Sequence, residues 1–225
     1  MNKYTRRFAI NCIIVMIFLL GESICNIFIE NNTIFTLVSF ILGLLAILSI
    51  DLIYKFHNKP KLNINIEFKD LTDNKDSTKT ILTNTDYDFK YYLGFEDDID
   101  NEINTIIHPK EDHKYWAVNV NNTLVGLIYI YNYDKVYKKC ALGYGLLPEY
   151  RGKGYTVPIV NKFCNYLENE FGIVRIQADI ETTNKPCLNT INSSLAELNF
   201  KYECTADNYW GSGCSCKLYS RCKQL

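Results

Sequence analysis

The chain has little net charge and few paired metal ligands. Its 24 Lys and Arg residues balance 25 Asp and Glu residues, so the net charge of −1 argues against a nucleic-acid partner. Only three His are present, and the nine Cys are scattered except for Cys214, Cys216 and Cys222, whose spacing predicts one face of a strand. A zinc site usually needs two close pairs of ligands, so no metal is expected, and reduced, partly buried thiols are predicted instead.

Two long apolar runs set residues 1–61 apart from the rest of the chain. The runs, at about residues 8–29 and 34–54, are separated by a short polar turn. A membrane-crossing helix needs about 20 mainly apolar residues, and basic flanks stay in the cytoplasm. Basic residues precede the first run and follow the second. We therefore expect an integral membrane hairpin in a lipid bilayer, with both termini and residues 62–225 on the cytoplasmic side.

The first run leaves an alternative open. Its basic start, followed by about 13 apolar residues and then Gly21 and Ser23, also fits a cleaved signal peptide, although a clean cleavage site is missing. The second run would still return residues 62–225 to the cytoplasm. A buried helical hairpin in a soluble protein is a further alternative, but the charge-free second run is longer than most core helices.

Residues 62–225 are predicted to form one α/β domain with a mixed sheet. Alternating apolar residues from Leu62 to Phe68 predict a strand, residues 70–80 a loop, and residues 85–107 one or two irregular helices. Three antiparallel strands should follow at residues 115–120, 124–131 and 136–147, joined by turns at 121–122 and 132–135.

The second half of this domain is predicted to alternate helices with strands. Apolar steps of three and four from Val157 to Phe171 predict an amphipathic helix, and residues 173–181 predict a strand. A second helix, capped by Thr183 or Asn184 and ending at Asn199, precedes a closing hairpin at residues 200–222.

A basic, glycine-rich turn joins the third of these antiparallel strands to the first amphipathic helix. Amides of such a turn and of the first helical turn point the same way, so together they bind anions. Gly152 and Gly154 allow close approach, and Arg151 and Lys153 add positive charge. An ordinary basic loop has the same composition, so the turn alone leaves both interpretations open.

Two motifs stand out in this domain. The first is Ala-Leu-Gly-Tyr-Gly-Leu-Leu-Pro-Glu-Tyr-Arg-Gly-Lys-Gly-Tyr-Thr at residues 141–156. The second is Ala-Asp-Ile-Glu-Thr-Thr-Asn, which ends at Asn184 and is followed by Ala196-Glu-Leu-Asn-Phe200. Together they resemble the GNAT superfamily of N-acetyltransferases, and most of all its branch of ribosomal-protein N-terminal acetyltransferases. Arg151, Gly154 and Thr156 stand at the three positions of the family's Arg/Gln-x-x-Gly-x-Gly/Ala pattern, and Asn184 at the family's Asn position. The resemblance implies a mostly antiparallel, mixed sheet flanked by helices, and covers roughly residues 62–225.

The resemblance also implies acetyl-CoA as the donor co-substrate. The family's pantetheine arm lies beside the end of the fourth strand, here at Leu146 and Leu147, where an N–H near Leu147 would stabilise the oxyanion. The family's pyrophosphate lies on main-chain amides of the turn, here those of Arg151, Gly152, Lys153, Gly154, Tyr155 and Thr156. Thr156 departs from the family's small third residue, which puts close packing there in doubt.

The catalytic groups implied by the resemblance are only partly present. Many members carry a base Glu where this chain has Ala141, so we expect Glu181 to act as the base, with Glu149 as the remaining alternative. The family's acidic Tyr is missing from the last helix, and Cys187 or Tyr144 can take its place.

The position of Asn184 matches the motif, and it is expected near the pantetheine and the acceptor. The stretch from Asn184 to Phe200 is about four residues longer than the usual pattern, close to one helical turn.

The sequence therefore predicts a membrane-anchored transferase, an acyltransferase of the N-acetyltransferase type. It would move an acetyl group from acetyl-CoA to a primary amine, either a small molecule or a protein N-terminus. The alternative is a non-catalytic CoA-binding or scaffold domain, which Ala141 and Thr156 favour. The acidic residues between Glu96 and Asp100 fit two interpretations, attraction of a cationic amine or the commoner one, a solvated acidic helix face.

Overall fold

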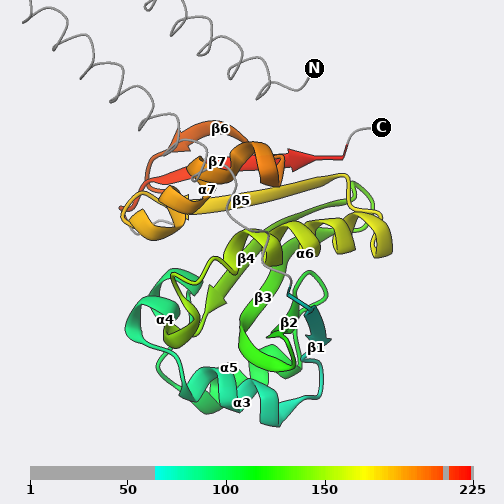
Figure 1. Cartoon of the computed structure of the whole chain (residues 1–225), viewed down its shortest axis with the longest axis vertical. Helices are drawn as coiled ribbons and strands as arrows, with labels where there is room; N and C mark the ends of the chain where they lie inside the picture. Colours follow the sequence, from blue (N-terminus) through cyan, green and yellow to red (C-terminus); the bar gives the residue numbers. More distant parts are fainter. Residues whose placement is uncertain (1–63, 210–212, 224–225) are drawn as a thin grey trace, which may run out of the picture. The chain divides into compact units, whose positions relative to one another are not determined.

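The computed structural model describes residues 64–209 and 213–223 (Figure 1). The expected spans at 8–29 and 34–54, and the expected domain boundary after residue 61, lie outside these described residues. Across residues 64–209 and 213–223, no helix has the length and apolar character needed to span a bilayer.

Among the described residues, seven strands form one mixed sheet in the order β1-β2-β3-β4-β5-β7-β6. Every neighbouring pair is antiparallel except β4 and β5, which run parallel. This arrangement confirms the predicted α/β class. The strands are β1 (Ile66–Asp70), β2 (Lys114–Val120), β3 (Thr123–Asp134), β4 (Lys139–Leu146), β5 (Arg175–Glu181), β6 (Lys201–Ala206) and β7 (Cys216–Cys222).

Helices cover both faces of the sheet, and each face has its own hydrophobic core. On one face, α6 (Thr156–Glu170) and α7 (Lys185–Leu198) pack on β1–β5 and β7 through residues such as Phe163 and Leu188. On the other face, α3 (Lys75–Thr83), α4 (Tyr87–Leu93) and α5 (Ile99–Ile107) pack on β2 and β3. A short 3-10 turn, η1 (Pro148–Tyr150), links β4 to the glycine-rich turn.

The helix α3 corrects the sequence prediction of a loop at residues 70–80. Its N-terminus is capped by Asn74, whose side chain accepts a hydrogen bond from the Ser77 amide at 3.2 Å. Only Thr78, Ile81 and Leu82 are buried, so the helix presents a narrow apolar stripe. The polar composition of the other positions hid this stripe in the sequence.

The turn between β3 and β4 lies three residues later than predicted. Asp134 accepts hydrogen bonds from the amides of Val136 and Tyr137, both at 2.9 Å, and this closes a turn over residues 135–138. The strand β3 therefore continues to Asp134 instead of ending at Tyr131. The extra length brings Tyr131 and its neighbours opposite the start of β4.

A buried arginine ties the last strand to α6. Arg221 is 7% exposed and donates to both carboxylate oxygens of Glu168, at 2.7 and 3.1 Å. Its remaining donors reach Asn161, Asn165 and the carbonyl of Leu198. Because every donor finds an acceptor, the buried charge is tolerated and fixes β7 against the helix.

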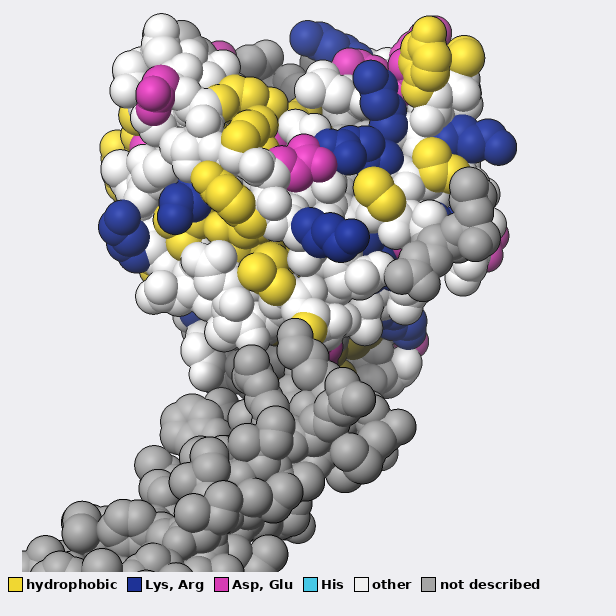
Figure 2. Space-filling view, turned by 90° about the horizontal axis from the view of Figure 1, so that it is seen from above, with side chains coloured by type: hydrophobic (Ala, Val, Ile, Leu, Met, Phe, Trp, Pro, Cys, Tyr) yellow, Lys and Arg dark blue, Asp and Glu magenta, His cyan; other side chains and the backbone are white. Residues whose placement is uncertain are grey.

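On the face shown in Figure 2, the described basic, acidic and hydrophobic side chains are interspersed. Opposite charges are thus mixed on this side of the described residues, in keeping with the nearly neutral composition.

Candidate active site

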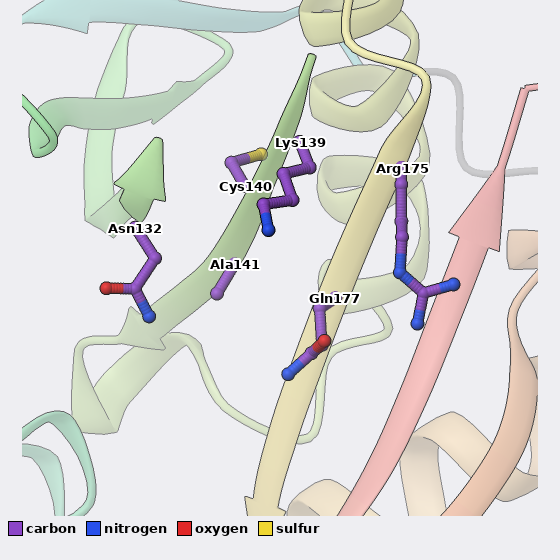
Figure 3. Close-up of a pocket in the computed structure, with 6 residues that line it drawn as sticks. All are labelled: Asn132, Lys139, Cys140, Ala141, Arg175 and Gln177. Atoms are coloured by element: carbon purple, nitrogen blue, oxygen red, sulfur yellow. The ribbon is translucent and has the colours of Figure 1, made fainter. Parts of the chain in front are cut away.

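The strands β4 and β5 separate after a short paired stretch. Pairing runs only from Lys139–Arg175 to Ala141–Gln177, although both strands continue beyond it. Figure 3 shows the two strands diverging from this end. The gap leaves main-chain groups of β4 without a strand partner, which is the usual setting for adding an extended ligand.

Strand alternation identifies which groups of β4 face the gap. The amide of Leu147 donates to the carbonyl of Val125 at 2.9 Å, so Leu147 and every second residue before it are turned toward β3. The main-chain groups of Leu142, Tyr144 and Leu146 consequently face β5. The expected oxyanion donor at Leu147 is therefore already used, and the amide of Leu146 is the next one along that faces the gap.

The glycine-rich turn leads directly from this edge into α6. Gly152 and Gly154 adopt φ of +69° and +80°, which favour glycine. Tyr155 is the N-cap of α6 but makes no capping hydrogen bond through its side chain, and Thr156 begins the helix. Lys153 lies over the ring of Tyr150, 5.2 Å from its centroid. The turn thus has the backbone form of an anion site, and its cofactor role remains a prediction.

The guanidinium of Arg151 is engaged elsewhere in the protein. Its Nε donates to the carbonyl of Leu146 at 3.0 Å. Its two terminal nitrogens donate to the two carboxylate oxygens of Asp86, at 2.7 and 2.8 Å. The Asp86 carboxylate is about two-fifths exposed, and the Arg151 hydrogen bond holds its pKa below the ordinary value.

Glu181 lies at the end of β5 and is 7% exposed. One of its oxygens accepts hydrogen bonds from the hydroxyl of Thr183 at 2.7 Å and from the hydroxyl of Tyr91 in α4 at 3.3 Å. The negative charge of Glu181 raises the pKa of Tyr91 to about 12, so Tyr91 stays protonated and donates. No local sequence pattern points to Tyr91, because its contact with Glu181 spans 90 residues.

Tyr144 and Cys187 meet on the opposite side of the gap. The Tyr144 hydroxyl lies 3.5 Å from the sulfur of Cys187, and both side chains pack against the core under α6 and α7. Burial raises the pKa of the Cys187 thiol and is also the main cause that raises the pKa of Tyr144. Both groups therefore keep their protons at neutral pH.

Asn184 caps α7, as one of the two predicted caps. Its side-chain oxygen accepts a hydrogen bond from the main-chain amide of Cys187 at 3.1 Å. The main-chain amide of Asn184 donates to the carbonyl of Glu181 at 3.0 Å. Asn184 thereby fixes the spacing between the carboxylate and the thiol. A direct contact between Asn184 and a ligand remains a prediction.

A second carboxylate faces the same side of the sheet as Glu181. Asp179 accepts hydrogen bonds from the hydroxyls of Tyr131 and Tyr209, at 3.2 and 3.1 Å, and from the side-chain amide of Gln177 at 2.8 Å. Tyr131 pairs with Ala141 across β3 and β4, so its hydroxyl reaches β5 past the small alanine. No local sequence pattern reveals this network, because Tyr131 and Asp179 are 48 residues apart.

A pocket of about 140 Å³ lies at the paired end of the two strands (Figure 3). It is lined by Asn132, Lys139, Cys140, Ala141, Arg175 and Gln177. In the described part of the chain, no group of three or more His, Cys, Asp or Glu side chains is suited to a metal ion.

Comparisons with known proteins agree with this geometry. The sequence model of the family described as Acetyltransferase (GNAT) domain matches residues 74–194. The SpeG spermidine N-acetyltransferase of Vibrio cholerae, in complex with CoA and spermine, has a TM-score of 0.58 at 14% identity, over 71% of this chain and 95% of that one. A structure described as a probable acetyltransferase has a TM-score of 0.55 at 21% identity, over 73% and 96%. No curated protein sequence matched the chain.

The family model covers more than half of the chain, so the protein belongs to the GNAT acetyltransferase family. It is an acyl-CoA-dependent N-acyltransferase, as the resemblance of the two sequence motifs implied. The assignment to the ribosomal-protein branch stays a prediction.

Proposed function

We propose that this protein is a membrane-anchored N-acetyltransferase that transfers the acetyl group of acetyl-CoA to a primary amine on the cytoplasmic side. The observation that carries the proposal is the open edge of β4, which runs into the glycine-rich turn and has proton-handling groups on both sides. Pantetheine amides would pair with main-chain groups of β4 that face the gap, such as those of Tyr144, and the pyrophosphate would lie on amides of residues 151–156.

Glu181 is the proposed base. It lies on the side of the sheet reached by α4, where an acceptor approaches the gap. The carboxylate takes a proton from the acceptor ammonium, directly or through one water, and the freed amine attacks the thioester carbon. The amide of Leu146 faces the gap and is the proposed donor to the developing oxyanion.

Tyr144, backed by Cys187, is the proposed acid for the leaving group. When the carbon–sulfur bond breaks, the CoA thiolate takes the Tyr144 proton. The proton that the new amide nitrogen loses then returns Tyr144 to its protonated form. The acid thus acts on the α7 side of the gap and the base on the α4 side, so the two proton transfers do not compete for one position.

A cationic acceptor is supported by the side of the sheet that carries the base. Asp179 and Glu181 are two residues apart on β5 and therefore point to the same side, about 7 Å apart. The V. cholerae structure with CoA and spermine provides a polyamine as a first compound to test. A protein N-terminus, as in the ribosomal-protein branch, is the second acceptor to test.

Membrane anchoring rests on the sequence of residues 1–61. The two apolar runs and their basic flanks support a hairpin that holds the catalytic domain at the cytoplasmic surface. An acceptor near the membrane would then be favoured by proximity.

The full chain, purified in detergent, tests the proposal directly. Acetyl-CoA should raise its melting temperature by mass action, and amines should release free CoA thiol. Glu181→Gln should lower kcat by at least about tenfold while the shift with acetyl-CoA persists. Glu197→Gln, an exposed carboxylate of α7, is the matched control and should leave both unchanged.

Two results would contradict the proposal. No thermal shift at millimolar acetyl-CoA would remove the cofactor assignment. A Glu181→Gln variant with the activity of the unaltered chain would remove the assignment of the base.

A further inference from the structure

The contact between Arg151 and Asp86 joins two parts of the site that are 65 residues apart. Arg151 begins the glycine-rich turn, and Asp86 is the N-cap of α4, where its side chain also accepts from the Phe89 amide at 3.0 Å. The arginine fork is bidentate, with both oxygens of Asp86 engaged. Such a pair fixes direction as well as distance.

The body of α4 is held against the sheet at two further points. A Cβ atom on Gly145 would lie 2.5 Å from the Phe89 ring and 2.8 Å from Leu93, so the helix rests directly on the bare backbone of β4. At the end of the helix, the Tyr129 hydroxyl donates to the carbonyl of Leu93 at 3.3 Å. The helix is thus fixed at its start, middle and end.

Tyr91 projects from this helix to Glu181. Its hydroxyl is the contact by which α4 reaches the carboxylate at the end of β5. A one-turn shift of so short a helix would remove the contact, because each turn advances about 5.4 Å.

We propose that Arg151 and Asp86 form a clamp that positions α4, and through Tyr91 orients the Glu181 carboxylate toward the acceptor. The arginine of the turn motif then serves the acceptor half of the reaction, while main-chain amides of the turn serve the cofactor. Arg151, Asp86 and Tyr91 are positioning residues. This inference rests on the proposed function of Glu181 as base.

The fork of Arg151 is already filled by protein acceptors. Its Nε is bound to the Leu146 carbonyl and its terminal nitrogens to Asp86. A pyrophosphate ligand would have to displace a bidentate carboxylate that also caps a helix. The Leu146 contact adds a second link, since the same arginine then sets the end of β4 relative to α4.

Steady-state kinetics of the full chain test the clamp. Asp86→Asn and Arg151→Gln should each lower kcat about tenfold, because small displacements of reacting groups are costly. The affinity for acetyl-CoA should stay within about twofold. Arg151→Lys should fail to restore the rate, since a lysine cannot form the fork. Asp88→Asn is the matched control, because it removes an exposed carboxylate from the same helical turn.

Non-additivity shows whether the clamp acts through Tyr91. Tyr91→Phe alone should lower kcat about as much as Asp86→Asn, and the double variant should be no slower than the slower single variant. Losses that multiply in the double variant would overturn the route through Tyr91.

A truncated donor separates the clamp from pyrophosphate binding. S-acetyl-pantetheine lacks the pyrophosphate. A variant that has lost a side chain that binds the pyrophosphate therefore loses its preference for acetyl-CoA over S-acetyl-pantetheine. If Arg151 acts through the clamp, the Arg151→Gln variant prefers acetyl-CoA over S-acetyl-pantetheine as strongly as the unaltered chain does. A preference that falls about tenfold in Arg151→Gln but not in Asp86→Asn would overturn the clamp.

Hydrogen exchange gives a readout that does not depend on turnover. Residues 87–93 should exchange faster in Asp86→Asn and Arg151→Gln than in Asp88→Asn. Unchanged exchange in both variants overturns the clamp even if the enzyme is active. If acetyl-CoA does not raise the melting temperature but hydrogen exchange of residues 87–93 is faster in the two variants, the clamp still holds α4. That result contradicts only the proposed function.

Discussion

At the scale of single residues, the Tyr144–Cys187 pair offers two candidate acids 3.5 Å apart. Both keep their protons because burial raises the pKa of each. The hydroxyl is carried by the strand whose free edge would hold the pantetheine, so it is the better placed of the two for the sulfur.

We therefore expect Tyr144→Phe to lower kcat about 100-fold, in the usual range for loss of a general acid. The melting shift with acetyl-CoA should remain. Cys187→Ser is the control, since it keeps a hydroxyl partner for Tyr144, and should cost less than Tyr144→Phe. A larger loss of kcat in Cys187→Ser than in Tyr144→Phe would indicate that the Cys187 thiol is the acid.

The sequence predicted some single residues well and others only by type. Asn184 and Asn199 were assigned from local rules, and they occupy the expected cap and left-handed positions. Arg151 was assigned to an anion by its charge, but its actual anion is Asp86, which no local pattern reveals. Tyr91 and Asp179 depend on contacts between distant elements, which lie beyond any local rule.

At the scale of elements, the absence of a side chain at Gly145 decides where α4 lies. Adding a methyl group there forces the Phe89 ring and Leu93 away from β4. Gly145→Ala should destabilise the protein by about 1–3 kcal/mol, as overpacking of a core does, and should lower activity through α4. Thermal unfolding and kinetics measure the two effects.

Gly145→Ala combined with Phe89→Leu is the control for this explanation. The smaller leucine side chain leaves room for the methyl group, so the double variant should lose less stability than the sum of the single variants. A strictly additive loss would show that the ring is not the obstacle.

An ion pair on the β5–β6 side of the sheet gives a pH dependence. Arg175, and then the Ser220 hydroxyl, hold the pKa of Glu203 below its ordinary value, with contacts of 2.7 and 2.6 Å. A lowered pKa in the folded state stabilises the protein above the ordinary pKa of glutamate. This stabilisation is lost as the pH falls through the lowered value.

Glu203→Gln should therefore lower the melting temperature at pH 7 by a small amount, worth about 0.5 kcal/mol for a pair that is one-third exposed. The difference from the unaltered chain should disappear as the pH falls below about 4. Glu197→Gln removes the same charge from an exposed site and should show no such pH dependence. A difference that grows in acid would contradict the assignment.

The elements that the sequence predicted are those with strong periodicity. The helix α6 and the strands β2 and β5 have clear apolar patterns, and each was found within about two residues of its predicted range. The helix α3 was missed because its stripe is narrow and flanked by polar residues. The β3–β4 turn was misplaced because Asn132 resembles a turn residue and takes φ of +51° within the strand.

At the scale of the whole molecule, we propose that residues 1–61 decide where the enzyme works. The two predicted spans give an outcome that is simple to measure. The full chain should remain in the membrane fraction after an alkaline carbonate wash, whereas a chain that begins at residue 62 should be released. Intact mass of the full chain distinguishes the hairpin from a cleaved signal peptide. Release of the full, uncleaved chain by the wash would contradict the anchor.

The position of β7 has a consequence for how the chain is made. This strand is the last of the described strands along the chain, yet it lies between β5 and β6 and carries the buried Arg221. During synthesis, β5 and β6 therefore leave the ribosome before the strand that joins them is available. For that interval the edge of β5 is unpaired and the Glu168 site on α6 is empty, which is the condition in which strands pair with the wrong neighbour. A stop codon or a bulky fusion placed before the end of β7 would leave β5 and β6 permanently without the strand that joins them.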